Sequence, residues 1–256
     1  MFSSAASARI LRVALLSLVL AFPGVSAAHD LTALVSASKP SIVGIGTRLK
    51  TRRPPNVLMA TGFVVGDGRT IVTNAHAIPK IEDPEFERLV IFIGTGRKVE
   101  VRPVKVTGKD DTHDLAILRQ DGAPLPSLKL AKAEPPLAEG SAIAFIGYPI
   151  GSVLGLYPVT HGGYLSAITP VVTPAASSNS LSAAQVRALK NPYFVYQLDA
   201  TAYPGNSGSP LFDADSGEVI GVINKVFVKS RKENVLSDPS DITYAIPVKF
   251  LHDLLY

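Results

Sequence analysis

The sequence is divided into many short runs of β-branched or alternating residues, and each run ends at Gly, Pro, Asn or Asp. Runs of this kind predict strands and turns. They fall into two groups on either side of a proline-rich stretch at 121–136. We therefore predict an all-β fold of two six-stranded antiparallel barrels followed by a C-terminal helix. The predicted strands are 41–49, 61–65, 70–73, 89–93, 99–106 and 115–118 in the first group, and 142–146, 159–168, 194–198, 210–212, 219–228 and 242–246 in the second.

A candidate nucleophile lies in the segment 199–210. Ser207 stands in a turn poor in large side chains, with Gly205 and Gly208 on its two sides. Such a turn exposes the hydroxyl group and leaves the neighbouring N–H groups unobstructed. Acyl transfer builds negative charge on the substrate oxygen, and fixed N–H donors stabilise that charge. The segment therefore predicts a serine nucleophile with its own oxyanion-binding site.

A serine hydroxyl needs a base and an acid that orients the base, and the sequence supplies both. His76 follows an apolar strand-like run, and Asp114 precedes the apolar run 115–118; Asp110 and Asp111 are alternative acids in a polar, turn-like stretch. The order His, Asp, Ser is that of chymotrypsin, whereas α/β-hydrolases run Ser, acid, His. The sequence also lacks the closing glycine of the hydrolase motif G-x-S-x-G.

Four stretches in order, TNAHAI, DLAIL, GNSGSP and TYAIP, resemble the signature segments of HtrA/Deg-type members of the trypsin-like serine proteases. The resemblance spans about 41–256 and implies a chymotrypsin-like fold with the active site between the two barrels. It also implies hydrolysis of peptide bonds in protein or peptide substrates, with no metal and no cofactor.

Carried over to this sequence, the resemblance assigns a role to each candidate residue. His76 would be the general base, Asp114 its orienting acid and Ser207 the nucleophile. Gly205, Asn206 and Ser207 would form the oxyanion hole, through the N–H groups of Gly205 and Ser207. No group of residues has the spacing of a metal site.

Two positions depart from the digestive members of the family. Asn206 stands where those enzymes carry an acid that pairs with a newly cut N-terminus, so activation by cleavage is not expected. Thr201 stands where enzymes that cut after Lys or Arg carry an acid. We therefore predict an uncharged substrate pocket, with Val222, Ile223 and Asn224 in its wall, and cleavage after small or medium apolar residues.

Ser209 replaces the glycine usual after GNSG in this family. If the position requires a positive φ, the serine would distort the oxyanion hole. The alternative to an active enzyme is therefore a catalytically weak or inactive protease fold that binds peptides in the same groove. A third possibility is an esterase that uses the same three residues.

Residues 1–28 have the pattern of a signal peptide. Arg9 and Arg12 precede an apolar stretch, and small residues follow up to Ala27 and Ala28, either of which could precede the cleavage point. The apolar stretch is short for a membrane span, although an uncleaved anchor is the alternative. We expect a periplasmic or secreted protein with no stable membrane insertion after cleavage.

Composition limits the partners and the means of stabilisation. The chain has no cysteine, so the exported protein must be held together by its core. The net charge of +4 falls to +2 without the two arginines of the signal, and nucleic acid is not expected as a partner. We predict barrels over 29–124 and 125–256 that form one peptidase unit. The sequence ends soon after the second barrel, so we expect no PDZ domain; the segment 29–39 has no aromatic residue, which favours a monomer.

Two helices are predicted outside the barrels. The pattern Ser-Ala-Ala-Gln at 182–185 begins a short helix inside a long loop that ends near 192. The second helix has Pro247 at its first position and an apolar face. That face consists of Phe250, Leu251, Leu254 and Leu255.

Overall fold

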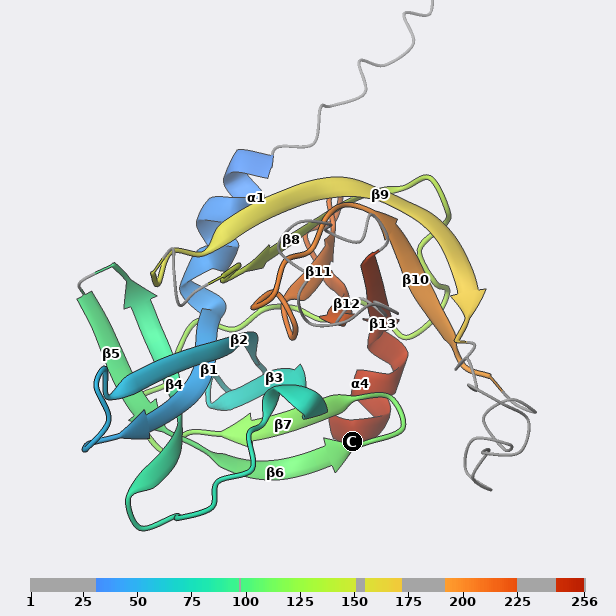
Figure 1. Ribbon diagram of the computed structural model, residues 1–256. Helices are drawn as coiled ribbons and strands as arrows, with labels where there is room; N and C mark the ends of the chain where they lie inside the picture. The colour runs from blue at the N-terminus through green and yellow to red at the C-terminus, as the bar shows by residue number, and fades with distance from the viewer. Residues whose placement is uncertain (1–30, 97, 151–154, 172–191, 225–242, 256) are drawn as a thin grey trace, which may run out of the picture.

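The computed structural model describes residues 31–96, 98–150, 155–171, 192–224 and 243–255. Within these residues the chain forms two antiparallel sheets, flanked by two α-helices (Figure 1). In chain order the elements are α1 (Leu31–Ser38), η1 (Lys39–Ser41), β1 (Ile42–Leu49), β2 (Asn56–Val65), β3 (Thr70–Asn74), η2 (Ala75–Ala77), β4 (Glu87–Thr95), β5 (Lys98–Pro103), β6 (Lys105–Asp110), β7 (Leu115–Arg119), β8 (Ala142–Gly147), β9 (Val159–Pro170), β10 (Phe194–Asp199), β11 (Pro210–Asp213), β12 (Val219–Asn224), β13 (Thr243–Pro247) and α4 (Val248–Leu255).

The N-terminal sheet differs from the predicted six-stranded barrel. It has seven strands in the order β5-β4-β1-β2-β3-β7-β6 and is open, with β5 and β6 at its two edges. The predicted strand 99–106 is in fact two strands, which end and begin on either side of Val104. Val104 is buried, and its N–H donates to the carbonyl of Leu89 on β4. The chain therefore leaves β4 at this residue and joins the opposite edge of the sheet beside β7.

A hairpin turn at Gly66-Asp67-Gly68 joins β2 to β3. Gly66 and Gly68 have φ values of 59° and 77°, which favour glycine, and Val65 pairs with Thr70 across the turn. The hairpin returns the chain along β3, between β2 and β7. The segment that carries His76 therefore begins at the end of a central strand of the sheet.

The C-terminal half forms the predicted closed barrel. Its strand order is β10-β13-β12-β11-β8-β9, and β9 closes the ring by pairing with both β8 and β10. Figure 1 shows β9 as the long strand that arches over this half of the molecule. The predicted strand 219–228 is described only as far as Asn224, and the remainder lies outside the described residues.

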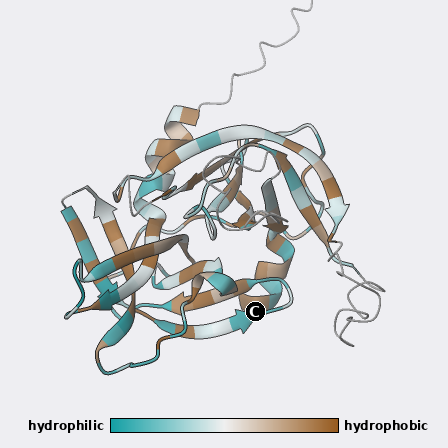
Figure 2. Ribbon diagram, viewed as in Figure 1, coloured by the Kyte–Doolittle hydropathy of each residue, from teal (hydrophilic) through white to brown (hydrophobic). Residues whose placement is uncertain are grey.

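One hydrophobic cluster joins the two sheets. It combines Ile42 and Phe63 from the open sheet with Val222 and Ile246 from the barrel and Leu251 from α4, all of them buried. Figure 2 shows hydrophobic residues along β2 and β7, whereas the outer strand β9 is mostly pale or hydrophilic. The apolar faces of the two halves are thus packed against each other. The nucleophile segment connects two strands of the barrel, β10 and β11.

The predicted C-terminal helix is confirmed as α4, although Pro247 is the last residue of β13 rather than the first of the helix. Leu251 is buried, and Leu254 and Leu255 pack on the shared cluster. Helix α1 was not predicted from the sequence. The helix predicted at 182–185 lies outside the described residues. Within the described part of the chain, no helix is both long and apolar enough to cross a membrane.

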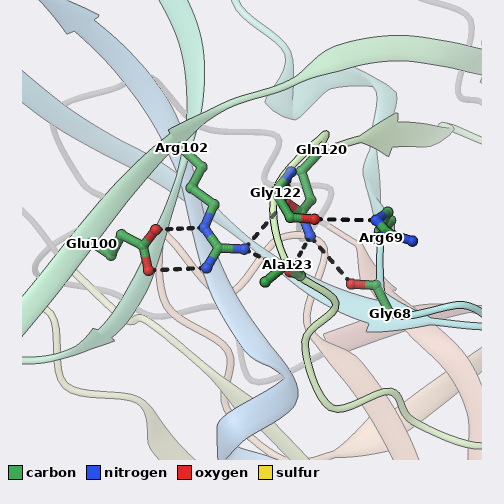
Figure 3. A network of polar contacts seen from close by, with 7 residues as sticks. All are labelled: Gly68, Arg69, Glu100, Arg102, Gln120, Gly122 and Ala123. Atoms are coloured by element: carbon green, nitrogen blue, oxygen red, sulfur yellow. Dashed lines mark hydrogen bonds and ion pairs between the residues drawn. The ribbon is translucent and has the colours of Figure 1, made fainter.

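A network of polar contacts binds the start of the proline-rich stretch 121–136, the crossing segment between the two halves, to the open sheet (Figure 3). The guanidinium group of Arg102 binds Glu100 at 2.6 Å and donates to the carbonyl of Ala123 at 2.8 Å. The buried amide of Gln120 donates to the same carbonyl at 2.9 Å, and its oxygen accepts the N–H of Gly122 at 2.7 Å. The residues that begin the proline-rich stretch are therefore held against the edge of the sheet.

Candidate active site

His76 lies on a single turn of 3₁₀ helix, η2, directly after β3. Its neighbours Ala75 and Ala77 are buried and fix the turn against the sheet, whereas 37% of the His76 side chain is exposed. The imidazole ring is therefore held on a rigid base and remains open to solvent.

The carboxylate of Asp114 contacts His76 twice. Oδ2 lies 2.6 Å from the ring nitrogen Nδ1, and Oδ1 accepts the backbone N–H of His76 at 2.8 Å. An ionised carboxylate can only accept hydrogen bonds, so Nδ1 carries the proton and Nε2 is left with a free lone pair. This arrangement fixes both the ring orientation and the tautomer that a general base requires.

The backbone of Asp114 is also fixed. Its φ of 54° lies in the left-handed region, which Asp and Asn tolerate better than most residues. Its carbonyl accepts the N–H of Ala75 at 3.1 Å and the side-chain amide of Asn74 at 3.0 Å. The two segments that carry His76 and Asp114 are thus joined by four hydrogen bonds, which offset the cost of the strained φ.

The two alternative acids have other partners. Asp110 binds the Nδ1 of His113, and Asp111 binds Lys109 at 2.7 Å. Burial alone would raise the pKa of Asp110, but the hydrogen bonds and charge of His113 and the N–H of Thr112 outweigh it and lower the pKa. Neither carboxylate is available to His76.

The turn around Ser207 depends on its two glycines. Gly205 has a φ of 101°, and a Cβ there would overlap the carbonyl oxygen of Tyr148. Gly208 has a φ of 84°, and a Cβ there would overlap the carbonyl oxygen of Thr61. Both positions therefore require glycine for conformation and for space.

Four carbonyl groups of this turn accept hydrogen bonds, and the N–H groups of Asn206 and Gly208 donate to the carbonyls of Tyr203 and Ile223. Among the described residues, the N–H groups of Gly205 and Ser207 have no acceptor. Each N–H points away from the carbonyl of the preceding residue, because peptide groups are planar and trans. Two N–H donors on one rigid turn, with no acceptor among the described residues, are the arrangement that an oxyanion-binding site requires. The carbonyls and their donors are Pro204 with Ile150 N–H (2.7 Å), Gly205 with Thr61 Oγ1 (2.7 Å), Asn206 with Ser209 N–H (3.0 Å) and Ser207 with Thr61 N–H (2.9 Å).

The structure joins two of the three predicted catalytic residues directly and the third through the sheet. In the described part of the chain, no hydrogen bond links the His76 ring to the Ser207 hydroxyl. Ser207 is instead tied through Thr61 on β2 to Thr73 on β3, because the Thr73 hydroxyl donates to the carbonyl of Thr61 at 2.7 Å. Hydrogen bonds between catalytic base and nucleophile commonly tighten only when substrate binds.

Asn206 is completely buried below the turn. Its Nδ2 lies 3.4 Å from the Nε2 of His161, so a neutral imidazole can accept this hydrogen bond, while its Oδ1 has no partner among the described residues. His161 is stacked on Phe145 with ring centroids 4.6 Å apart. Burial lowers the pKa of His161, which favours the neutral form that accepts the Asn206 amide.

Ser209 does not occupy a position that requires glycine. Outside glycine, only Asp114 and Ile150 have positive φ values among the described residues, so Ser209 has an ordinary backbone conformation. Its side chain is buried, and its hydroxyl has no partner in the described structure. The sequence-based concern that Ser209 distorts the turn is therefore wrong in its premise, since the required glycines are Gly205 and Gly208.

The residues predicted to form the substrate pocket have different environments. Thr201 is half-buried and Asn224 is partly exposed, whereas Val222 and Ile223 are buried in hydrophobic clusters. The backbone of Ile223 pairs with the nucleophile segment, since its N–H donates to the carbonyl of Ser209 at 2.8 Å. A cavity of about 550 Å³ lies elsewhere and includes Arg48, Phe86 and Arg88 in its lining, with no predicted site residue.

Sequence reasoning missed two residues that shape this site, Thr61 and Ile150. Both act on the turn through contacts with segments far away in the chain, and neither belongs to a recognisable motif. The only local signal was the run ATGFVV that contains Thr61, which reads as an ordinary strand. No group of three or more His, Asp or Glu residues that could hold a metal ion occurs in the described ranges.

Known proteins resemble this chain in sequence. The sequence profile of the family described as trypsin-like peptidase domain matches residues 60–222. Relatives named probable periplasmic serine endoprotease DegP-like come from Halomonas elongata (30% identity over 77% of this chain) and Hahella chejuensis (26% over 88%). The chain spans 34% and 48% of the length of these two relatives.

Solved structures of the same kind share the fold. A serine endoprotease from Yersinia pestis has a TM-score of 0.61 at 22% identity, covering 88% of this chain and 64% of its own. The Rv3671c protease of M. tuberculosis in its active form has a TM-score of 0.62 at 21% identity, covering 87% and 82%. The resemblance inferred from the four sequence stretches is confirmed, and the chain belongs to the trypsin-like peptidase family.

Proposed function

We propose that this protein is a serine endopeptidase that cuts unfolded or extended proteins through an acyl-enzyme on Ser207. The observation that carries the proposal is the double contact of the Asp114 carboxylate with His76, at 2.6 Å and 2.8 Å. This chemistry needs no metal ion, and we propose that no cofactor takes part.

In the proposed reaction, Nε2 of His76 removes the proton of the Ser207 hydroxyl as the oxygen attacks the substrate carbonyl. Asp114 stabilises the imidazolium ion that forms. The free N–H groups of Gly205 and Ser207 would bind the developing oxyanion, with Asn206 holding the turn from below. His76 then protonates the leaving amine, and water repeats the cycle to release the acid.

We propose that the substrate pocket is uncharged and accepts small or medium apolar side chains. Thr201 would form its floor, and Val222, Ile223 and Asn224 its wall. Burying a lysine or arginine there without a partner carboxylate would be costly. The expected result with a panel of peptides that differ at one position is faster cleavage after Val or Ala than after Arg, and a preference for Arg would contradict this proposal.

The names of the relatives and the composition support a proposal about location and partners. The two relatives are named periplasmic, and we propose a periplasmic or secreted protein whose residues 1–28 are a cleaved signal. Protein or peptide substrates would be its partners, without nucleic acid or stable membrane insertion. We also propose that the chain is a monomer whose units, 29–124 and 125–256, act together.

A peptide-binding module without catalysis is less well supported. That possibility rested on Ser209, which has an ordinary backbone φ, and on the loop with the helix predicted at 182–185, which lies outside the described residues. The esterase possibility shares the same residues and differs only in substrate.

Labelling with a serine-directed fluorophosphonate tests the proposed function. The wild type should be labelled, Ser207→Ala should not, and Ser209→Ala should be labelled like the wild type, since it removes a nearby serine that has no role in the reaction. Casein digestion by the same three proteins separates a peptidase from an esterase, because an esterase would hydrolyse a small ester without cutting casein. A folded wild type that is not labelled would support the binding module.

A further inference from the structure

Thr61 on β2 is a buried polar residue that connects the open sheet with the barrel. Its side chain is completely buried. Its hydroxyl donates to the carbonyl of Gly205 at 2.7 Å and accepts the N–H of Tyr148 at 2.9 Å. One hydroxyl thus satisfies two buried backbone groups, one in the nucleophile turn and one just after β8.

The backbone of Thr61 contacts the same turn. Its N–H donates to the carbonyl of Ser207 at 2.9 Å, and its carbonyl accepts the hydroxyl of Thr73 at 2.7 Å. The carbonyls on both sides of Asn206 are therefore held by a single residue of the other sheet. Thr73 lies on the strand that leads to His76, so Thr61 connects the base and nucleophile segments.

The conformation of Gly205 depends on contacts of this kind. Glycine has no Cβ that would limit its backbone angles, and a φ of 101° is one of many that it can adopt. Its carbonyl is held by Thr61, and the carbonyl of the preceding Pro204 is held by Ile150. Without the hydroxyl of Thr61, the Gly205 carbonyl and the Tyr148 N–H would both lose their buried partner, and rotation of the turn would relieve them.

We propose that Thr61 is a positioning residue that keeps the N–H groups of Gly205 and Ser207 directed toward the substrate. It acts through the carbonyls of Gly205 and Ser207, which fix the peptide groups that follow the two donor residues, and it does not touch the substrate. This inference rests on the proposed function, since it concerns the same oxyanion-binding site.

The test compares Thr61→Val, which keeps the shape of the side chain but removes the hydroxyl, with Thr61→Ser, which keeps the hydroxyl. Loss of one oxyanion donor costs about a hundred- to a thousandfold in rate, so partial misorientation should lower kcat of Thr61→Val by about ten- to a hundredfold. KM and the affinity for a cleaved product peptide should change little. Thr61→Ser should stay within about threefold of the wild type in both kcat and the rate of fluorophosphonate labelling.

Thr47→Val is the matched control for a purely structural effect. Thr47 is a buried threonine on β1 whose hydroxyl accepts a hydrogen bond from Arg52, and it contacts no part of the turn. This variant should lose stability and keep the wild-type kcat. If Thr61→Val does not fold, Thr61→Ala replaces it in the same assays.

Three results would overturn the inference: a folded Thr61→Val with wild-type kcat and labelling rate, a loss confined to KM, or failure of both Thr61→Val and Thr61→Ala to fold, which would make the residue structural only. Failure of the proposed function looks different, because the wild type itself would then not be labelled at Ser207.

Discussion

The ring of Phe250 on α4 stacks on the imidazole of His113, with ring centroids 3.9 Å apart and planes inclined by 16°. His113 is bound at the same time to Asp110 and lies edge-on to Tyr193 at 4.7 Å. Burial, and then the carboxylates of Asp114 and Asp110, raise the pKa of Tyr193. The C-terminal helix is thus packed against the segment that presents Asp114.

Replacing Phe250 with alanine should weaken this packing. The ring is only half-buried, so we expect a loss of about 2 kcal/mol in the free energy of unfolding, below the usual cost for a fully buried phenylalanine. We also expect kcat to fall, since Asp114 follows His113 directly. Urea unfolding measures the first effect, and Asp253→Ala, an exposed change on the same helix, should alter stability by less than about 0.5 kcal/mol. Equal stability of the two variants would contradict the prediction.

Asp114→Asn should lower kcat by about ten-thousandfold and leave KM nearly unchanged. Asparagine tolerates the left-handed φ of 54° and can still accept the backbone N–H of His76. An amide group opposite Nδ1 would, however, favour the wrong tautomer of the ring. Asp111→Asn is the control and should leave kcat unchanged, because Asp111 is paired with Lys109. If kcat fell more in Asp111→Asn than in Asp114→Asn, the assignment of Asp114 as the orienting acid would be wrong.

Ser209→Ala should raise the free energy of unfolding by about 1 kcal/mol and keep full activity. The substitution removes a buried hydroxyl that has no partner in the described structure. Gly208→Ala, one residue earlier, should lose activity and stability, because φ is 84° there and a Cβ would overlap the Thr61 carbonyl oxygen. Thermal unfolding and casein digestion measure both variants, and an inactive Ser209→Ala would show that its hydroxyl has a role.

His161 should make stability depend on pH below neutrality. Burial lowers its pKa in the folded protein from the ordinary value of 6.5, so the unfolded chain binds the proton more readily. Stability should therefore fall as pH decreases from about 6.5 toward the lowered pKa of the folded state. The lowered pKa of Asp110 acts in a different range, with stability lost only below its ordinary value of 3.8.

His161→Gln removes the titrating group and keeps an acceptor for the Asn206 amide. Urea unfolding of the wild type and this variant, measured at intervals from about pH 5 to pH 8, should show the slope only in the wild type. The same slope in both proteins would place its origin in another residue.

Much of the fold could be predicted because its strands are short and end at Gly, Pro, Asn or Asp. The two barrels could not be distinguished from one barrel and one open sheet, since the difference lies in how edges pair. A signal for the division of 99–106 was nevertheless present. Val99 and Val101 alternate on odd positions, whereas Val104 and Val106 alternate on even ones, and this change of phase marks the end of one strand and the start of another.

The candidate site shows the same limit. His76, Asp114 and Ser207 stand in short motifs and could be proposed from the sequence. Thr61 could not, because its contact with Gly205 joins positions 144 residues apart and depends on how the two sheets are packed. Hydrogen bonds of this range follow from tertiary structure alone.

The hydrophobic cluster shared by the two sheets makes each half dependent on the other. Ile42 and Phe63 on one side, and Val222 and Ile246 on the other, are covered only while both halves are in place. If the chain were cut in the crossing segment and the halves separated, each half would expose these apolar residues to water and lose its folded structure. Neither half alone would therefore keep the segments of His76 and Ser207 at their mutual distance.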